Sequence, residues 1–161
     1  MRKLTSIAVV VMIVSAFDGG MSAQNRAPAL PQIAAVSYPD SPLTITASRI
    51  LSVRSPAAVA FEITNITNRS IGDYDVRVYA YRANGRPIGF RSVRQRADLR
   101  PGTEHADLVS LGEWILEPGT VVLITITGAT FADETVWRVP LQDAQDRVKA
   151  EAARLIGVSG V

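Results

Sequence analysis

Between positions 105 and 110 the chain places three side chains that together could perform hydrolysis. His105, the single histidine, would share one face of an extended strand with Asp107, and Ser110 lies close by in the sequence. A nucleophilic serine, a histidine base and a carboxylate that orients the histidine form an acyl-transfer triad. Tertiary structure normally assembles such a triad from separate segments, and neighbours on one strand do not supply its geometry. We therefore expect a solvent-facing polar strand without catalysis, and we keep a hydrolase that uses His105 as the last alternative.

Two pairs of carboxylates, Asp73 with Asp75 and Asp133 with Glu134, could in principle hold a hard cation through oxygen ligands. Neither pair lies within the spacing of a calcium-binding loop. The chain has no cysteine and one histidine, so it offers no thiolate nucleophile, no disulfide and no ordinary set of zinc ligands. We expect no metal and no cofactor, and we assign these carboxylates to turns and strand ends.

Arginine is concentrated between positions 82 and 100, where six arginines accompany a single acid, Asp98. Guanidinium groups form paired hydrogen bonds with carboxylate and phosphate. One interpretation is a patch that binds an acidic glycan or a lipid headgroup, and its candidate residues are Arg86, Arg91, Arg94 and Arg96. The other interpretation is that these charges protect the edge of a sheet and pair with acidic residues further along the chain.

Tyr79 and Tyr81 would lie on one face of a strand, opposite the face expected to enter the core. Rigid aromatic rings can form a platform for a carbohydrate or a protein partner. That face is exposed unless the C-terminal helix or the N-terminal linker covers it. Cross-strand packing of the rings is the alternative explanation.

Seven segments have the alternation and the β-branched or aromatic residues typical of strands. They are residues 43–47, 58–64, 74–82, 87–93, 104–111, 120–127 and 135–139. The segment 120–127 is apolar on both faces and is expected to be central. We predict an all-β fold, a two-sheet antiparallel sandwich of immunoglobulin-like type with about seven strands, and a small barrel as the alternative.

Three short sequences are expected to make the tight turns of this sandwich. Asn84-Gly85 suits a type I′ turn, which requires positive φ at both central residues. Pro101-Gly102 and Pro118-Gly119 each fit the central positions of a type II turn. These turns divide the chain into hairpins.

The two ends of the chain differ from the sandwich. Residues 1–23 have the layout of a signal peptide, and cleavage after Ala16 is the alternative to cleavage after Ala23. The apolar run of the leader is too short to span a bilayer, so we expect no integral membrane protein after signal cleavage. Residues 24–42 contain four prolines and are expected to be an extended linker.

The sandwich domain is assigned to residues 43–140, an amphipathic helix to 141–157 and a short tail to 158–161. The helix has one apolar stripe and Gly157 as its stop signal. We expect it to fold back onto its own sheet, and docking on a partner is the alternative. Without residues 1–23 the chain has 15 basic and 14 acidic residues, a balance that argues against nucleic-acid binding.

The order of strand and turn residues between 58 and 111 resembles bacterial extracytoplasmic immunoglobulin-like modules, with the FxLYD and CARDB domain families as the nearest groups. The residues that carry this resemblance are Val59-x-Phe61-x-Ile63-x-Asn65, Val76-x-Val78-x-Ala80-Tyr81, Asn84-Gly85, Ile88-Gly89 and Leu99-x-Pro101-Gly102. The resemblance implies an exported, modular setting and no shared catalytic residues.

Together these patterns predict a periplasmic or secreted module that binds or supports another protein of the cell envelope without catalysis. A binder of acidic glycan or lipid headgroups through the arginine-rich hairpin is the second function considered.

Overall fold

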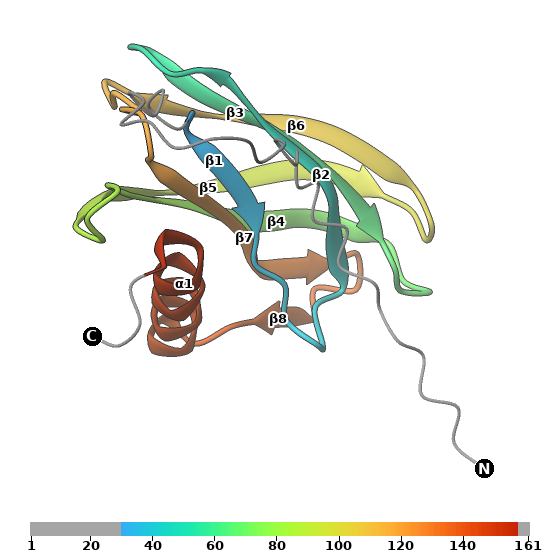
Figure 1. Ribbon diagram of the computed structural model, residues 1–161. Coiled ribbons are helices and arrows are strands. Elements are labelled where there is room, and N and C mark those ends of the chain that lie inside the picture. The colour runs from blue at the N-terminus through green and yellow to red at the C-terminus, as the bar shows by residue number, and fades with distance from the viewer. Residues whose placement is uncertain (1–29, 158–161) are drawn as a thin grey trace, which may run out of the picture.

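The computed structural model describes residues 30–157, which form two β-sheets packed face to face and one helix outside them (Figure 1). The five-stranded sheet has the order β1-β7-β4-β5, with β8 also pairing with β7, and the three-stranded sheet has the order β2-β3-β6. The predicted sandwich with a C-terminal helix is therefore confirmed. The strands are β1 (Gln32–Ala35), β2 (Leu43–Ser52), β3 (Ala57–Asn65), β4 (Ile71–Tyr81), β5 (Pro87–Leu99), β6 (Glu104–Gly112), β7 (Val121–Phe131) and β8 (Val136–Arg138).

The core lies between the two sheets and is built from alternate residues of facing strands. On β3 the buried side chains include Val59, Phe61 and Ile63, and on β4 they include Val76 and Val78. Because successive side chains of a strand point to opposite faces, this period of two places one apolar row from each sheet in the interior. Full burial of each such side chain contributes about 1.5–3 kcal/mol to folding.

Strand β7 is central, as its apolar sequence predicts. Every residue from Val121 to Ala129 is buried. One edge of β7 pairs with β4, and the other pairs with β1 and β8. The inner face of β7 enters the core and its outer face lies under the helix, which explains the continuous apolar run.

The proline-rich segment 24–42 is not a linker throughout, so that prediction needs a correction. Residues 32–35 form β1, which pairs in parallel with residues 121–124 of β7, and Val36 beyond it is buried. Pro31 precedes the strand and Pro39 follows it, so neither removes a hydrogen bond from the paired region. Four residues show too short a pattern to be recognised, and their partner lies almost ninety positions away. The folded domain therefore begins well before the predicted boundary at Leu43.

The β4–β5 hairpin forms where predicted, but its turn is of a different type. Gly85 has φ of +79°, whereas Asn84 is not among the residues with positive φ in the described chain. Gly85 N donates to Arg82 O, and Arg82 N donates to Arg86 O. This pattern is a type I turn followed by a left-handed glycine, a three-residue hairpin loop that needs positive φ at one position only. The type I′ prediction was therefore wrong.

The two Pro-Gly turns are confirmed. Gly102 and Gly119 have φ of +72° and +78°. Thr103 N donates to Arg100 O, and Thr120 N donates to Glu117 O. Glycine at the third position with this hydrogen bond is the pattern of a type II turn.

The C-terminal helix α1 (Leu141–Ile156) packs on the outer face of the five-stranded sheet, over β7 (Figure 1). Its buried residues are Ala144, Val148 and Ala152, and Gly157 closes it in the left-handed conformation with φ of +74°. The helix thus folds back onto its own sheet, as predicted. The predicted leader, 1–23, and tail, 158–161, lie outside the described residues. Within residues 30–157, no helix has the length and apolarity that a membrane span would need.

Candidate functional site

The four arginines of the predicted patch do not gather on one surface. Arg86 lies at the exposed hairpin turn. On the edge strand β5, Arg91 pairs with Val78, whose side chain enters the core, whereas Arg94 and Arg96 pair with Asp75 and Asp73 on the opposite face. Residues opposite each other in a ladder share a face, so the arginine-rich strand divides its charges between both faces.

Two of these arginines already have partners within the protein. Arg94 donates from Nε and Nη2 to Asp73 Oδ1, at 2.9 and 2.6 Å, and from Nη2 to Thr130. The Arg91 guanidinium lies 5.9 Å from the ring centre of Trp114. These contacts support edge protection and internal pairing more than an open anion-binding patch.

The predicted tyrosine platform is covered. Tyr79 is only 6% exposed because Val148 and Ala152 of α1 pack over it, and Tyr81 is half-buried at the same interface. Tyr79 also stacks on Phe90, with ring centres 5.9 Å apart. The two tyrosines therefore attach the helix to the sheet, and the platform prediction was wrong for the folded domain.

The three residues of the hypothetical triad are not brought together either. His105 Nε2 is 3.8 Å from Asp107 Oδ2, but that oxygen accepts a hydrogen bond of 2.8 Å from Tyr74 OH. Ser110 is three residues from Asp107 on the same strand and so lies on the other face, where its Oγ accepts from the backbone N–H of Gly112. Tyr74 belongs to the other sheet, so Asp107 makes a polar link between the sheets.

Burial is the main cause that raises the pKa of Tyr74, and the hydrogen bond and charge of Asp107 raise it further. The phenol therefore stays protonated and continues to donate to Asp107. This link supports a structural role for the aspartate of the hypothetical triad.

The carboxylate pairs make ion pairs with arginines. Asp73 binds Arg94, Asp75 lies 3.7 Å from Arg138, and Asp133 binds Arg69. Within residues 30–157, no group of three or more histidine, aspartate or glutamate side chains is placed to hold a metal ion.

A shallow surface lies at one end of the sandwich, where three loops surround an open hollow of about 480 Å³. One wall comes from the β1–β2 loop, another from the β3–β4 loop, and the third from the end of β7 and from β8. The lining residues are Pro39, Asp40, Ser41, Pro42, Ile66, Thr67, Arg69, Phe131, Thr135, Val136 and Trp137. We call this surface the loop-end hollow.

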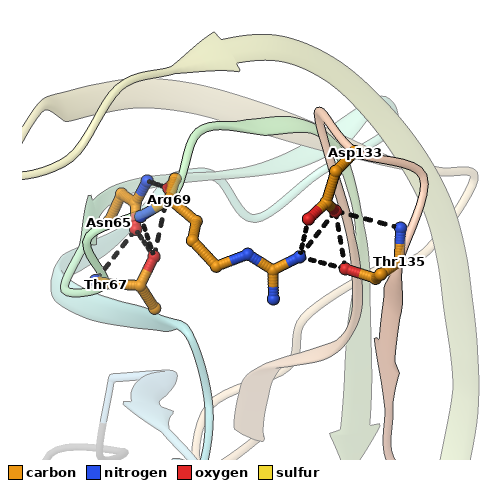
Figure 2. A network of polar contacts seen from close by, with 5 residues as sticks. All are labelled: Asn65, Thr67, Arg69, Asp133 and Thr135. Atoms are coloured by element: carbon orange, nitrogen blue, oxygen red, sulfur yellow. Dashed lines mark hydrogen bonds and ion pairs between the residues drawn. The ribbon is translucent and has the colours of Figure 1, made fainter.

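The β3–β4 wall is held by Asn65, whose side chain is fully buried (Figure 2). Its Nδ2 donates to the carbonyl oxygens of Arg69 and Leu99, at 2.7 and 2.8 Å. Its Oδ1 accepts from the backbone N–H and the hydroxyl of Thr67, at 3.0 and 2.8 Å. The Asn65 side-chain amide thus makes all four hydrogen bonds that it can form, and together they fix this loop.

Arg69 connects that loop to the β7–β8 wall (Figure 2). Its Nη2 donates to both carboxylate oxygens of Asp133, at 2.5 and 2.6 Å, and also to the hydroxyl of Thr135. The guanidinium carbon lies 3.8 Å from the ring centre of Phe131, a distance suited to a cation–π contact. Hydrogen bonds from Thr135, and then from Arg69, lower the pKa of Asp133 to about 2.

Trp137 forms the remaining fixed part of the hollow. Its indole Nε1 donates to Asp40 Oδ2 at 3.2 Å, and its ring packs against Tyr38 with centres 6.4 Å apart. Two aliphatic side chains of the lining stay open to solvent: Ile66 is 60% exposed and Val136 is 57% exposed. The hollow therefore combines a bonded polar frame with two unburied aliphatic groups.

Sequence reasoning missed the loop-end hollow as a site. It identified no candidate residue in the loop 66–70 and none at Trp137. Residues 66–69 meet residues 131–137 only through the fold, and no local motif announces that contact. The one local signal was an aliphatic residue, Ile66, within the otherwise polar run 65–70.

Comparison with known proteins yields a fold relationship and no family. No family model matches the chain, and no curated protein matches it. A solved structure of a hypothetical protein from Peptoclostridium difficile 630 is similar, with a TM-score of 0.52 and 15% identity over 69% of this chain and 92% of that one. A Bordetella pertussis protein provisionally named ApaA has a TM-score of 0.37 and 16% identity, over 61% of this chain and 86% of that one. The first similarity supports the sandwich fold alone.

Proposed function

We propose that this protein is a non-catalytic binding module that works outside the cytoplasm, in the periplasm or as a secreted protein, and recognises another protein of the cell envelope through the loop-end hollow. The observation that carries this proposal is the exposure of Ile66 and Val136, both of which line a hollow whose loops are joined by hydrogen bonds. Exposed aliphatic side chains that gather at a concave surface with a polar rim are typical of protein interaction sites. Export is supported by the leader-like pattern of residues 1–23.

The hydrogen bonds between the loops of the hollow favour recognition. Asn65, Arg69 and Asp133 hold the loops by hydrogen bonds within the protein. A preformed surface loses less conformational entropy on binding than a flexible one. The loop-end position also resembles the way in which variable immunoglobulin domains use the loops at one end of their sandwich.

The arginine-rich hairpin receives less support as a binder of acidic glycan or lipid headgroups. Arg94 is paired with Asp73, and Arg91 turns towards Trp114. A hydrolase that uses His105 also receives less support, because Ser110 lies on the other face of β6. We therefore place protein recognition at the hollow ahead of both.

The test is quantitative capture of partners from a native envelope extract by the tagged chain lacking residues 1–23, at low and high salt, with identification by mass spectrometry. Two variants, Ile66→Asp and Val136→Asp, place a charge in the hollow. Leu108→Asp is the matched control, since Leu108 is an aliphatic residue of β6 that is 54% exposed outside the hollow.

We expect one protein to be recovered by the wild type and by Leu108→Asp, and to be lost with either hollow variant. Melting temperatures close to the wild-type value must accompany that loss. Equal recovery by all four proteins would refute the hollow as the binding surface. Recovery only of acidic glycan or lipid that is released at high salt would instead support the arginine-rich hairpin.

A further inference from the structure

The polar groups of the loop-end hollow are largely used within the protein. The Thr67 hydroxyl donates to Asn65 Oδ1, the Thr135 hydroxyl donates to Asp133, and the Ser41 hydroxyl donates to Leu43 O. A sugar is recognised mainly through hydrogen bonds to its many hydroxyl groups. The three hydroxyls of the lining are thus already committed, which makes the hollow poorly suited to a carbohydrate.

Two lining side chains keep hydrogen-bonding capacity for a ligand. The hydrogen bonds of the Arg69 side chain within the described chain all run through Nη2, so Nε and Nη1 still have N–H groups to donate. Asp40 accepts one bond, from Trp137 Nε1, and its carboxylate can accept more. The hollow thus offers a donor on the β3–β4 wall and an acceptor on the β1–β2 wall.

The charges of the lining also balance. Arg69 is its one basic residue and Asp40 its one acidic residue. An anionic ligand would be repelled by Asp40 and would gain little from Arg69, because Asp133 already neutralises the guanidinium. A cationic side chain would lose hydration if it packed against Ile66 and Val136. Charge argues against an anion and the aliphatic lining argues against any charged side chain, so together they favour an uncharged ligand.

We propose that the loop-end hollow takes an uncharged, extended peptide segment of the partner that carries an aliphatic side chain. This inference rests on the proposed function. The aliphatic side chain would pack between Ile66 and Val136, which are left exposed in the free protein. A peptide unit has one C=O acceptor for Arg69 and one N–H donor for Asp40, so a single backbone supplies both polar partners.

The experiment uses the 15N-labelled chain lacking residues 1–23 and follows its two indole N–H signals by NMR. Trp137 lines the hollow and donates to Asp40, whereas Trp114 packs at the core and reports on the rest of the fold. The probes are pentapeptides Ac-Gly-Ser-X-Ser-Gly-NH2, in which X is leucine, serine, aspartate or lysine, and the disaccharide maltose. The variant Ile66→Asp serves as the negative control for the protein.

The leucine peptide should shift the Trp137 signal, leave the Trp114 signal in place, and bind about tenfold more tightly than the aspartate and lysine peptides. Ile66→Asp should abolish that shift. A response to maltose, or an equal response to the aspartate or lysine peptide, would overturn the inference. If no peptide shifts Trp137 while partner capture still depends on Ile66, the partner presents a folded surface. The proposed function then survives and this inference does not. If neither the shift nor the capture depends on Ile66, both fail.

Discussion

Replacement of Asn65 by alanine tests whether one buried amide holds the binding end of the sandwich together. Asn65 is fully buried at the end of β3. Its side chain makes four hydrogen bonds, which join Thr67, Arg69 and Leu99. Alanine removes all four and leaves two backbone carbonyls without these donors. The loop that carries Ile66 and Arg69 would then lose its internal support.

The expected cost can be worked out from these contacts. A typical hydrogen bond contributes about 0.5–1.5 kcal/mol net, and a buried polar group left unpaired costs about 1–3 kcal/mol. The buried bond to Leu99 O falls in the second class, and the three part-buried bonds to Arg69 and Thr67 fall in the first. We therefore expect Asn65→Ala to lower the free energy of unfolding by about 2.5–7.5 kcal/mol. For a domain of this size, even the lower figure lowers the melting temperature by roughly 8 °C.

The assay is urea unfolding followed by fluorescence, with the slope against urea checked for two-state behaviour. Thr67→Val is the companion variant, because it removes only the hydroxyl, which donates to Asn65 Oδ1 and accepts from Arg69 N, and should cost about 1–3 kcal/mol. Asn65→Asp should cost at least as much as alanine, because its carboxylate faces the two carbonyl oxygens that the amide served. A loss below about 1 kcal/mol for Asn65→Ala would refute the view that this amide fixes the loop.

Four further predictions each concern one side chain. Tyr79→Phe should leave stability unchanged or raise it by up to about 1–2 kcal/mol, because the buried Tyr79 hydroxyl has no partner among the described residues. Tyr74→Phe should instead lower stability by about 1–2 kcal/mol, because it removes the bond to Asp107; urea unfolding compares the two, and equal effects would contradict this reading. Val148→Ala should lower the melting temperature, because Val148 is buried against the sheet, whereas Lys149→Ala should not, because Lys149 is exposed. If a calorimetric scan gives both variants the wild-type melting temperature, the helix does not pack on the sheet in solution. Folding lowers the pKa of Asp133 from 3.8 to about 2. The contribution of Asp133 to stability is therefore complete above its unfolded pKa and is lost as the pH falls through about 2. NMR titration of the Asp133 carboxyl carbon measures this pKa, and a midpoint near 3.8 would show that the hydrogen bonds to Thr135 and Arg69 do not persist.

Local sequence pattern was sufficient for seven of the eight strands of the described chain and for most turns. The alternation on β3 and β4 and the two Pro-Gly pairs are decided within a few residues, so their signals survive without knowledge of the fold. The Asn84-Gly85 turn was placed correctly but given the wrong type, because glycine after asparagine fits both the two-residue and the three-residue hairpin loop. The choice between them depends on strand register, which is a property of the pair and not of the turn.

The parts that sequence could not predict depend on contacts between distant segments. β1 exists because residues 32–35 meet the edge of β7, and Tyr79 is buried because a helix about seventy positions later packs over it. The alternation of β4 correctly predicts that Tyr79 points to the outer face of the sheet. Whether that face is exposed or buried depends on the position of α1, which the strand sequence does not encode. The same reasoning applies to the arginines, whose face and partners follow from the register of β5 against β4.

The placement of function follows from how the two ends of the chain are used. β1 and α1 both pack on the outer side or edge of the five-stranded sheet, next to β7, and they cover the surface where an aromatic platform was expected. The internal ion pairs of Asp73, Asp75 and Arg94 occupy another part of that outer face. The loop end, by contrast, keeps two aliphatic side chains exposed although its polar groups are firmly bonded. Several large apolar side chains of the described domain are exposed, Leu108 among them, but Ile66 and Val136 are the two of that set that line the hollow, which is the physical reason to look for a partner there.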